Sequence, residues 1–332
     1  MPTLTIQDAV ERYLDSVKLA RSHNTLLTYK KSMQAFLDCM RAEGLAADAP
    51  LSTLNEDAVA HFAAYSKNKS PATERLRLQA AAGFYEFLAA ERLAEPNLPR
   101  VRMLIRQRGR RPGPRLPQFP REAIEQMLDY ADTLDRLPAK DEIEALRNKR
   151  DKAFILTLGE TGLRVHEACK LTRGDMQMQE GKAIVIGKGN QEAMVRFSRR
   201  AIGAIRSYLQ ARGSLDSASG RQLGSLPLFA RHDKGAGSKK VKAITPSTGR
   251  NIIARHVALA LGDEAKGTIS PHSFRHYFVT AVLRGTGGNL KMAQELARHK
   301  NIQVTQRYAH LSDDELDRGY YEVFENSDNR SD

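Results

Sequence analysis

Residues 271–280, PHSFRHYFVT, decide how the C-terminal part of the chain folds. The serine before this stretch and its first proline are a common helix start, because proline fits the first helical position. In a helix that begins there, His272, Arg275 and His276 stand at i, i+3 and i+4 and share one face. The stretch therefore predicts a helix that presents one guanidinium and two imidazoles together.

Residues 296–311, LARHKNIQVTQRYAHL, add His299 and Tyr308. The Tyr308 phenol could attack a phosphodiester, although a phenol with a pKa of about 10 needs a neighbouring base or cation. Arg275 could hold the phosphate, because a guanidinium makes two parallel bonds and keeps its charge. A nucleophile and cations beside phosphorus are what such an attack requires. Together, the two stretches indicate nucleophilic attack on a phosphodiester.

A third stretch, residues 160–171, reads ETGLRVHEACKL. Its threonine and Gly162 end an apolar helix, and Arg164 opens the next helix. Glu167 lies one turn after Arg164 and could hold the guanidinium by a charge-assisted bond. The stretch predicts a second arginine for the same site, with a carboxylate that supports it.

A fourth stretch, residues 183–197, reads AIVIGKGNQEAMVRF. Two runs rich in strand-forming residues flank Gly-Lys-Gly-Asn, which is a hairpin turn signal. Lys188 lies at the tip of this hairpin. A lysine on a mobile hairpin can reach a leaving group.

Taken together, these residues resemble the tyrosine recombinases, also called phage integrases, with the bacterial Xer-like enzymes nearest in style. The resemblance covers nearly the whole chain. It implies that Glu167 and His276 support the site. It also implies a catalytic set of six residues: Arg164, Lys188, His272, Arg275, His299 and Tyr308.

By the same resemblance, Tyr308 forms a 3′-phosphotyrosyl link and Lys188 protonates the leaving 5′ oxygen. The arginines and histidines of the set stabilise the pentavalent phosphorus, and rejoining proceeds through a Holliday junction. No metal and no other cofactor is implied. One departure stands beside the site, because the family usually reads Leu-Gly-His where this chain has an alanine, Arg298 and His299.

The charge of the chain points to an acidic partner. Lys and Arg outnumber Asp and Glu by 52 to 39, which gives a net charge of +13, and nucleic acid fits this balance better than a membrane. No apolar run reaches about 18 residues, and no signal peptide is visible, so we expect a cytoplasmic, nucleoid-associated protein. The resemblance further implies double-stranded DNA as partner, assembly of free monomers or weak oligomers into a tetramer on two duplexes, and accessory DNA-bending proteins.

The chain should be mainly α-helical with a small antiparallel β-sheet. We expect a helical SAM-like core-binding domain at 1–98, a basic linker rich in Arg and Pro at 99–118, and an α+β catalytic domain at 119–332. Within the last, helical spacing of apolar residues predicts an interaction helix at 313–325. Residues 132–150 read as a family-variable insertion. Two cysteines that fall among apolar positions of separate domains predict buried, reduced thiols.

The linker holds seven arginines and no acid between residues 100 and 115. Such a stretch does not fold alone, and an extended chain that crosses DNA phosphates is the favoured interpretation over a solvated tether. A glycine- and lysine-rich loop near residue 240 is also basic. The expected DNA-binding residues are Arg100, Arg102, Arg106, Arg108, Arg110, Arg111, Lys239, Lys240 and Lys242.

Three other functions stay open. A type IB topoisomerase or a telomere resolvase would use the same chemistry, but those enzymes usually carry other domains. A non-catalytic DNA-binding relative should have lost Tyr308 or an arginine. A zinc hydrolase could use His272 and His276 as ligands at i and i+4, but no third ligand has the spacing of a metal site.

Overall fold

The chain folds into two compact units, one within residues 1–115 and one within residues 116–332, and each unit has a hydrophobic core of its own. The predicted fold class, mainly α-helical with one small antiparallel sheet, is confirmed. No described helix is long and apolar enough to cross a membrane. The structure, a computed structural model, describes residues 3–110, 120–187, 192–232, 241–299 and 301–306.

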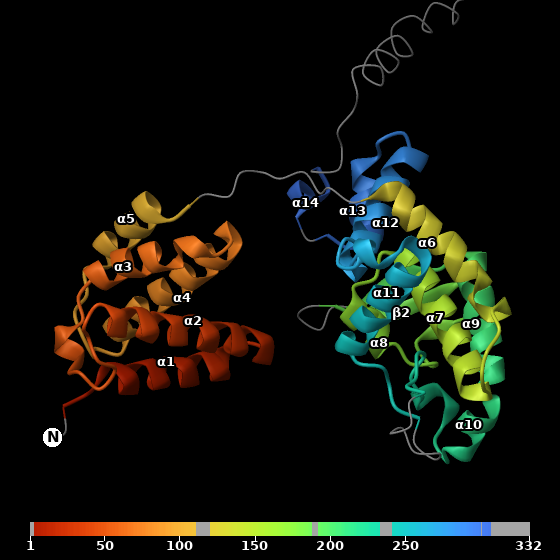
Figure 1. Cartoon of the computed structure of the whole chain (residues 1–332), viewed down its shortest axis with the longest axis horizontal. Helices are drawn as coiled ribbons and strands as arrows, with labels where there is room; N and C mark the ends of the chain where they lie inside the picture. The colour runs from red at the N-terminus through yellow and green to blue at the C-terminus, as the bar shows by residue number, and fades with distance from the viewer. Residues whose placement is uncertain (1–2, 111–119, 188–191, 233–240, 300, 307–332) are drawn as a thin grey trace, which may run out of the picture. The chain divides into compact units, whose positions relative to one another are not determined.

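The N-terminal unit is a helical bundle (Figure 1), and aromatic side chains lie in its core. Thr5 starts the first helix with a capping box, because its side chain accepts from the Asp8 N–H and its own N–H donates to the Asp8 carboxylate. In the core, the rings of Phe36 and Phe62 meet edge to face at 5.2 Å. The α-helices described in this unit are α1 (Ile6–Ala20), α2 (His23–Ala42), α3 (Asp57–Tyr65), α4 (Pro71–Ala90) and α5 (Leu98–Arg108).

The C-terminal unit is organised around α7, which packs against α6, α9 and α12 (Figure 1). Phe154 of α7 is fully buried and meets Phe229 edge to face at 5.2 Å. The α-helices described in this unit are α6 (Arg121–Thr133), α7 (Glu142–Thr161), α8 (Val165–Lys170), α9 (Arg199–Ala211), α10 (Gly213–Ala218), α11 (Pro246–Leu261), α12 (Pro271–Gly285), α13 (Leu290–Ala297) and α14 (Ile302–Gln306).

The stretch 132–150, which the sequence predicts to be a family-variable insertion, is partly built into the central helix α7. Asp141 caps α7 by accepting a hydrogen bond from the Glu144 N–H, so residues 142–150 are the first turns of α7. The buried Arg150 belongs to these turns. The status of these residues as an insertion relative to the family stays a prediction, and their polar character concealed a helix whose other half is apolar.

The predicted antiparallel sheet is present and has the strand order β1-β2-β3, with β1 at Met176–Gln177, β2 at Lys182–Ile186 and β3 at Glu192–Arg196. Ala183 and Val195 pair across β2 and β3 and are both buried. The sheet therefore turns one face to the core, as its alternating pattern requires. The hairpin tip with Lys188 lies outside the described residues.

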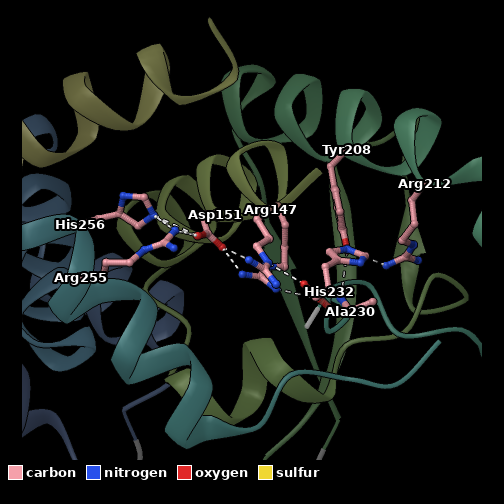
Figure 2. Close-up of polar contacts among 9 residues, drawn as sticks. Arg147, Asp151, Tyr208, Arg212, Ala230, His232, Arg255 and His256 are labelled. Carbon is pink, nitrogen blue, oxygen red and sulfur yellow. Dashed lines mark hydrogen bonds and ion pairs between the residues drawn. The ribbon is translucent and has the colours of Figure 1, made fainter. Parts of the chain in front are cut away.

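A buried polar network joins α7, α9 and α11 (Figure 2). The Asp151 carboxylate of α7 is fully buried and contacts Arg255 at 2.7 Å and His256 at 3.0 Å. Farther along, the Tyr208 hydroxyl of α9 contacts the His232 imidazole at 2.7 Å. Because a buried carboxylate is tolerated only with such partners, the network fixes how these helices pack.

Both cysteines are free and buried, as predicted. Burial raises the pKa of Cys39 to about 11 and the pKa of Cys169 to about 12. Both side chains therefore stay protonated at neutral pH, and a protonated thiol is a poor nucleophile and a poor metal ligand.

The first half of the expected linker is a helix, which corrects the prediction of an extended stretch. Asn97 caps α5 by accepting a hydrogen bond from the Arg100 N–H, and a proline occupies its first turn. Val101 and Leu104 are buried against α3 and α4. The apolar residues recur at helical spacing between the arginines. Burial of these residues stabilises a helix despite the basic composition of the stretch.

Arg110, just beyond α5, is bonded to Glu74, whose side chain is fully buried in α4. The Arg110 guanidinium donates to one carboxylate oxygen, and its main-chain N–H donates to the other at 2.9 Å. Lys67 donates to the same carboxylate at 3.1 Å. A buried carboxylate needs such cations, so the structure gives Arg110 a structural role within the N-terminal unit.

We expect Arg110→Gln to lower the free energy of unfolding by about 1–3 kcal/mol, because Glu74 would keep only one cation in a buried position. The exposed Arg106 offers a matched control, since Arg106→Gln removes the same charge and should change stability by less than about 0.5 kcal/mol. Urea denaturation of the full chain measures both. Equal losses in the two variants would contradict the structural role.

Candidate active site

Gly162 creates the turn that delivers Arg164 to the site. It ends α7 with a φ of +62°, and a Cβ at this position would lie 2.4 Å from the Phe278 ring. Both facts require glycine. α8 then begins at Val165 with Arg164 at its N-cap, which confirms the helix end and the helix start predicted for this stretch.

Glu167 holds Arg164, and this predicted contact is present. The Arg164 Nη1 donates to Glu167 Oε1 at 2.9 Å, and the Arg164 main-chain N–H donates to Oε2 at 2.9 Å. The carboxylate is nearly buried, whereas 42% of the Arg164 side chain is exposed. Burial raises the pKa of Glu167, but the bonds from Arg164 and neighbouring positive charge outweigh this effect and lower it.

Arg275 joins three helix ends. It lies in α12, which starts with Ser270 as N-cap and a proline in its first turn, as predicted. Its buried guanidinium donates to the main-chain oxygens of Gly162, at the end of α7, and of Ala297, at the end of α13. The site therefore forms where the ends of α7 and α13 meet the first turns of α12.

Three imidazoles lie around these arginines. The rings of His272 and His276 approach edge to face, with centroids 4.1 Å apart. The His299 Nδ1 contacts the Thr305 hydroxyl of α14 at 2.9 Å, and Gln294 of α13 donates to the His299 main-chain oxygen at 3.0 Å. The turn between α13 and α14 thus fixes His299 on both its side chain and its backbone.

The histidines are neutral at pH 7. Burial, together with the positive charges of Arg275 and Arg164, lowers the pKa of His299 to about 4. Burial and the adjacent His272 lower the pKa of His276 to about 4, and burial and Arg275 lower the pKa of His272. The guanidiniums therefore carry the charge, while each neutral imidazole offers one donor and one acceptor.

Arg298 is a site residue whose side-chain contact the sequence did not reveal. It follows α13 in the left-handed region, with a φ of +56°, at the position where the sequence resemblance predicts glycine. Its Nη2 donates to Glu167 Oε2 at 3.0 Å. The unusual arginine was visible in the sequence as a departure, but the partner, 131 positions away, was not.

The structure thus brings most predicted catalytic residues together. This arrangement can bind an anion, because three arginines and three neutral imidazoles surround a single carboxylate among the described residues. Tyr308 and Lys188 lie outside the described residues. The residues gathered at the site are Arg164, Glu167, His272, Arg275, His276 and His299.

The expected DNA-binding residues are spread over both units. Arg100 pairs with Asp57 at 2.7 Å and Arg102 pairs with Glu86 at 3.0 Å, both on the surface. Exposed side chains with no acidic partner in the described residues are Arg106, Arg108 and Lys242. Arg111, Lys239 and Lys240 lie outside the described residues.

The family model described as "Phage integrase family" matches residues 119–315. The chain belongs to the phage integrase family. A second model, described as "Phage integrase, N-terminal SAM-like domain", matches residues 10–92 of this integrase. The two matches fall in the two compact units.

Curated relatives of the integrase are tyrosine recombinases. It is 27% identical over 319 residues to tyrosine recombinase XerC of Bacillus subtilis (strain 168), which covers 95% of each protein. It is 29% identical over 313 residues to tyrosine recombinase XerD of Pseudomonas aeruginosa, covering 91% of this chain and 92% of that protein. Family and relatives together make the integrase a tyrosine site-specific recombinase.

Solved structures share the fold of the integrase. XerH site-specific recombinase bound to a palindromic difH substrate has a TM-score of 0.65, at 17% identity over 95% of each chain. The Tn1549 transposon integrase in complex with transposon right end DNA has a TM-score of 0.64, at 18% identity over 97% of this chain and 100% of that chain. At these identities the similarity concerns the fold alone.

The two arginines predicted to be catalytic should differ in their effect on stability. Arg275→Ala removes a buried charged donor from two main-chain oxygens, so we expect a loss of about 3 kcal/mol in the free energy of unfolding. Arg164→Ala removes a half-exposed side chain and leaves Glu167 paired with Arg298, so its loss should stay below about 1 kcal/mol. Thermal unfolding at pH 7 without DNA compares them. Similar melting temperatures for the two variants would refute this assignment of burial.

Proposed function

We propose that this recombinase cuts and rejoins duplex DNA at a specific site through a covalent link to Tyr308. The observation that supports this most is the convergence of Arg164 and Arg275 with three neutral imidazoles. Such donors suit a phosphodiester whose non-bridging oxygens gain negative charge in the transition state. Tyr308 follows three residues after Thr305, whose hydroxyl contacts His299.

In the proposed first step, the Tyr308 oxygen attacks the phosphorus, and the bond from phosphorus to the 5′ oxygen breaks. A 3′-phosphotyrosyl link and a free 5′ hydroxyl result. A neutral imidazole, His272 or His299, accepts the phenol proton, because its lowered pKa leaves it unprotonated. Lys188 gives the departing oxygen its proton.

In the second step, the 5′ hydroxyl of another duplex gives its proton to Lys188 and attacks the phosphotyrosine. The phosphodiester is restored, and the protonated imidazole returns its proton to the departing Tyr308 oxygen. Exchange of one strand pair gives a Holliday junction, and exchange of the second pair resolves it. The relatives named recombinase, which match along most of the chain, favour this outcome over the simple relaxation of a topoisomerase.

Double-stranded DNA is the proposed partner, and the cytoplasm, with the chromosome, is the proposed place of action. The net charge of +13 supports a polyanionic partner. The structurally similar XerH and Tn1549 integrase are bound to DNA in their solved structures. On this chain, Arg106, Arg108 and Lys242 offer exposed charge for phosphates.

We expect Tyr308→Phe to abolish covalent protein–DNA adducts while DNA binding survives, because the substitution removes only the attacking oxygen. Adducts are collected from host DNA under denaturing conditions, and sequencing the attached DNA yields the target duplex and the cleavage position. Tyr65→Phe, at an exposed tyrosine of the N-terminal unit, is the control and should keep adduct formation. Adducts that persist in Tyr308→Phe would exclude Tyr308 as the nucleophile.

For assembly, we propose a tetramer on two duplexes, in which residues 313–325 of one protomer dock on the next. Leu316, Tyr320 and Phe324 recur in the sequence at helical spacing, and an apolar stripe of this kind needs a surface to cover it. Accessory DNA-bending proteins would then set the direction of the reaction. These residues lie outside the described part of the chain.

Truncation after Ser312 should spare binding of one protomer to a half-site but abolish cooperative binding and two-duplex complexes. Each large apolar side chain that docks contributes about 1.5–3 kcal/mol, so the loss should be complete in native gels. The charge-introducing Leu316→Glu variant of the full chain tests the same contact without shortening it. Two-duplex complexes formed by both variants would contradict docking through this segment, and a strongly lowered melting temperature would place the segment on its own domain instead.

A further inference from the structure

The backbone of Arg298 is unfavourable for an arginine. Its φ of +56° and ψ of +45° are left-handed, a conformation that glycine adopts readily and other residues seldom adopt. Among the described residues, only Arg92 shares a positive φ without being glycine. Such a backbone costs free energy for a residue other than glycine, and a side-chain contact can offset this cost.

That contact is with Glu167. The Arg298 side chain is only 12% exposed, and its Nη2 donates to Glu167 Oε2 at 3.0 Å. Within the described part of the chain, its Nη1 is buried and has no hydrogen-bond partner. The Arg298 guanidinium is therefore largely removed from water, and its side-chain hydrogen bond is to one carboxylate.

The same carboxylate holds the catalytic Arg164, which bonds its other oxygen, Oε1, at 2.9 Å. Glu167 thus bridges two guanidiniums, one at the start of α8 and one at the end of α13. With Glu167 ionised, Arg164 and Glu167 alone would sum to zero charge, whereas the three groups carry a net charge of +1. Arg298 restores the positive charge that Glu167 would otherwise cancel beside Arg164.

The turn at Arg298 also reaches the other catalytic arginine. The main-chain oxygen of Ala297, the preceding residue, accepts a hydrogen bond from Arg275. The turn that follows α13 therefore contacts both arginines. It reaches Arg275 through its backbone, and it reaches Arg164 indirectly, through Arg298 and Glu167.

We propose that Arg298 is a positioning residue of the recombination reaction, which acts through Glu167 to hold Arg164 in place and to keep the site positively charged. This inference rests on the proposed function. It assigns a role to a residue at which this chain departs from the usual glycine of the family. The role is distinct from contact with the substrate.

The acid side of the pH profile should report this role. Burial raises the pKa of Glu167, and the positive charge of Arg298 is among the effects that lower it below its usual value. Without Arg298 the pKa of Glu167 rises, so Glu167 is protonated at a higher pH and releases Arg164 there. Glu167 lies in α8. The other charged or titratable groups near this helix are Arg164 at its N-cap, His166 and Lys170 within it, Arg250 of α11 and Arg275 of α12.

The test measures single-turnover cleavage of the duplex recovered from wild-type adducts, across pH, for Arg298→Gly and Arg298→Met. Both variants remove the charge, but only glycine also relieves the backbone. We expect both to slow cleavage by about 10- to 100-fold, by analogy with the loss of residues that orient metal ligands in other enzymes. DNA affinity should hold, and the acid limb should move to higher pH. Arg298→Lys, which restores the charge without the planar fork, should recover part of the rate.

Arg92→Gly is the matched control for the backbone, because it relieves the other left-handed non-glycine residue at an exposed position of the N-terminal unit. It should leave the cleavage rate and its pH profile unchanged. Unchanged cleavage in both Arg298 variants, or slower cleavage with an unmoved acid limb, would overturn the inference. A wild-type protein that forms no Tyr308-dependent adduct would overturn the proposed function instead.

Discussion

The arrangement of the site depends on two hydrogen bonds that the buried guanidinium of Arg275 donates. Arg275 lies in α12 and reaches the end of α7 through Gly162 and the end of α13 through Ala297. Both acceptors are main-chain oxygens at helix ends. The last carbonyl groups of a helix have no partner within the helix and must find one elsewhere. A charged donor with a rigid, planar set of N–H groups suits this purpose, because it satisfies two acceptors at once. The residue that we assign to chemistry is therefore also the residue that assembles the site.

The electrostatics of the site follow from the close approach of its positively charged side chains. Several cations brought together in a partly buried place repel one another, and the chain limits the repulsion in two ways. Glu167 adds one negative charge, and the histidines remain neutral because burial and the guanidiniums lower the pKa of His276 and His299. What remains is a positively charged site whose neutral imidazoles can still exchange protons. A bound phosphodiester would supply the missing negative charge and raise those histidine pKa values again.

The sequence predicted the parts of the structure that depend on local signals. The serine and proline before α12, the glycine at the end of α7 and the alternating strands each act over a few residues, and all three were confirmed. The helix α5 was missed because its arginines dominate the composition, although Val101 and Leu104 carry the helical period. The pairs of Arg110 with Glu74 and of Arg298 with Glu167 join distant positions, and no local pattern encodes such contacts. The roles of Tyr308 and Lys188 remain predictions.

The two buried cysteines have a practical consequence. Each lies in the core of a different unit, and burial both shields the thiol and raises its pKa, which disfavours the thiolate that attacks maleimide and methanethiosulfonate reagents. The natural chain is thus already silent toward such labels. A single cysteine in place of the exposed Leu19, or a pair in place of Leu19 and Leu223, would take up spin labels or fluorophores without removal of either native cysteine. Distances between the two units, with and without a DNA duplex, then become measurable in the otherwise unmodified protein.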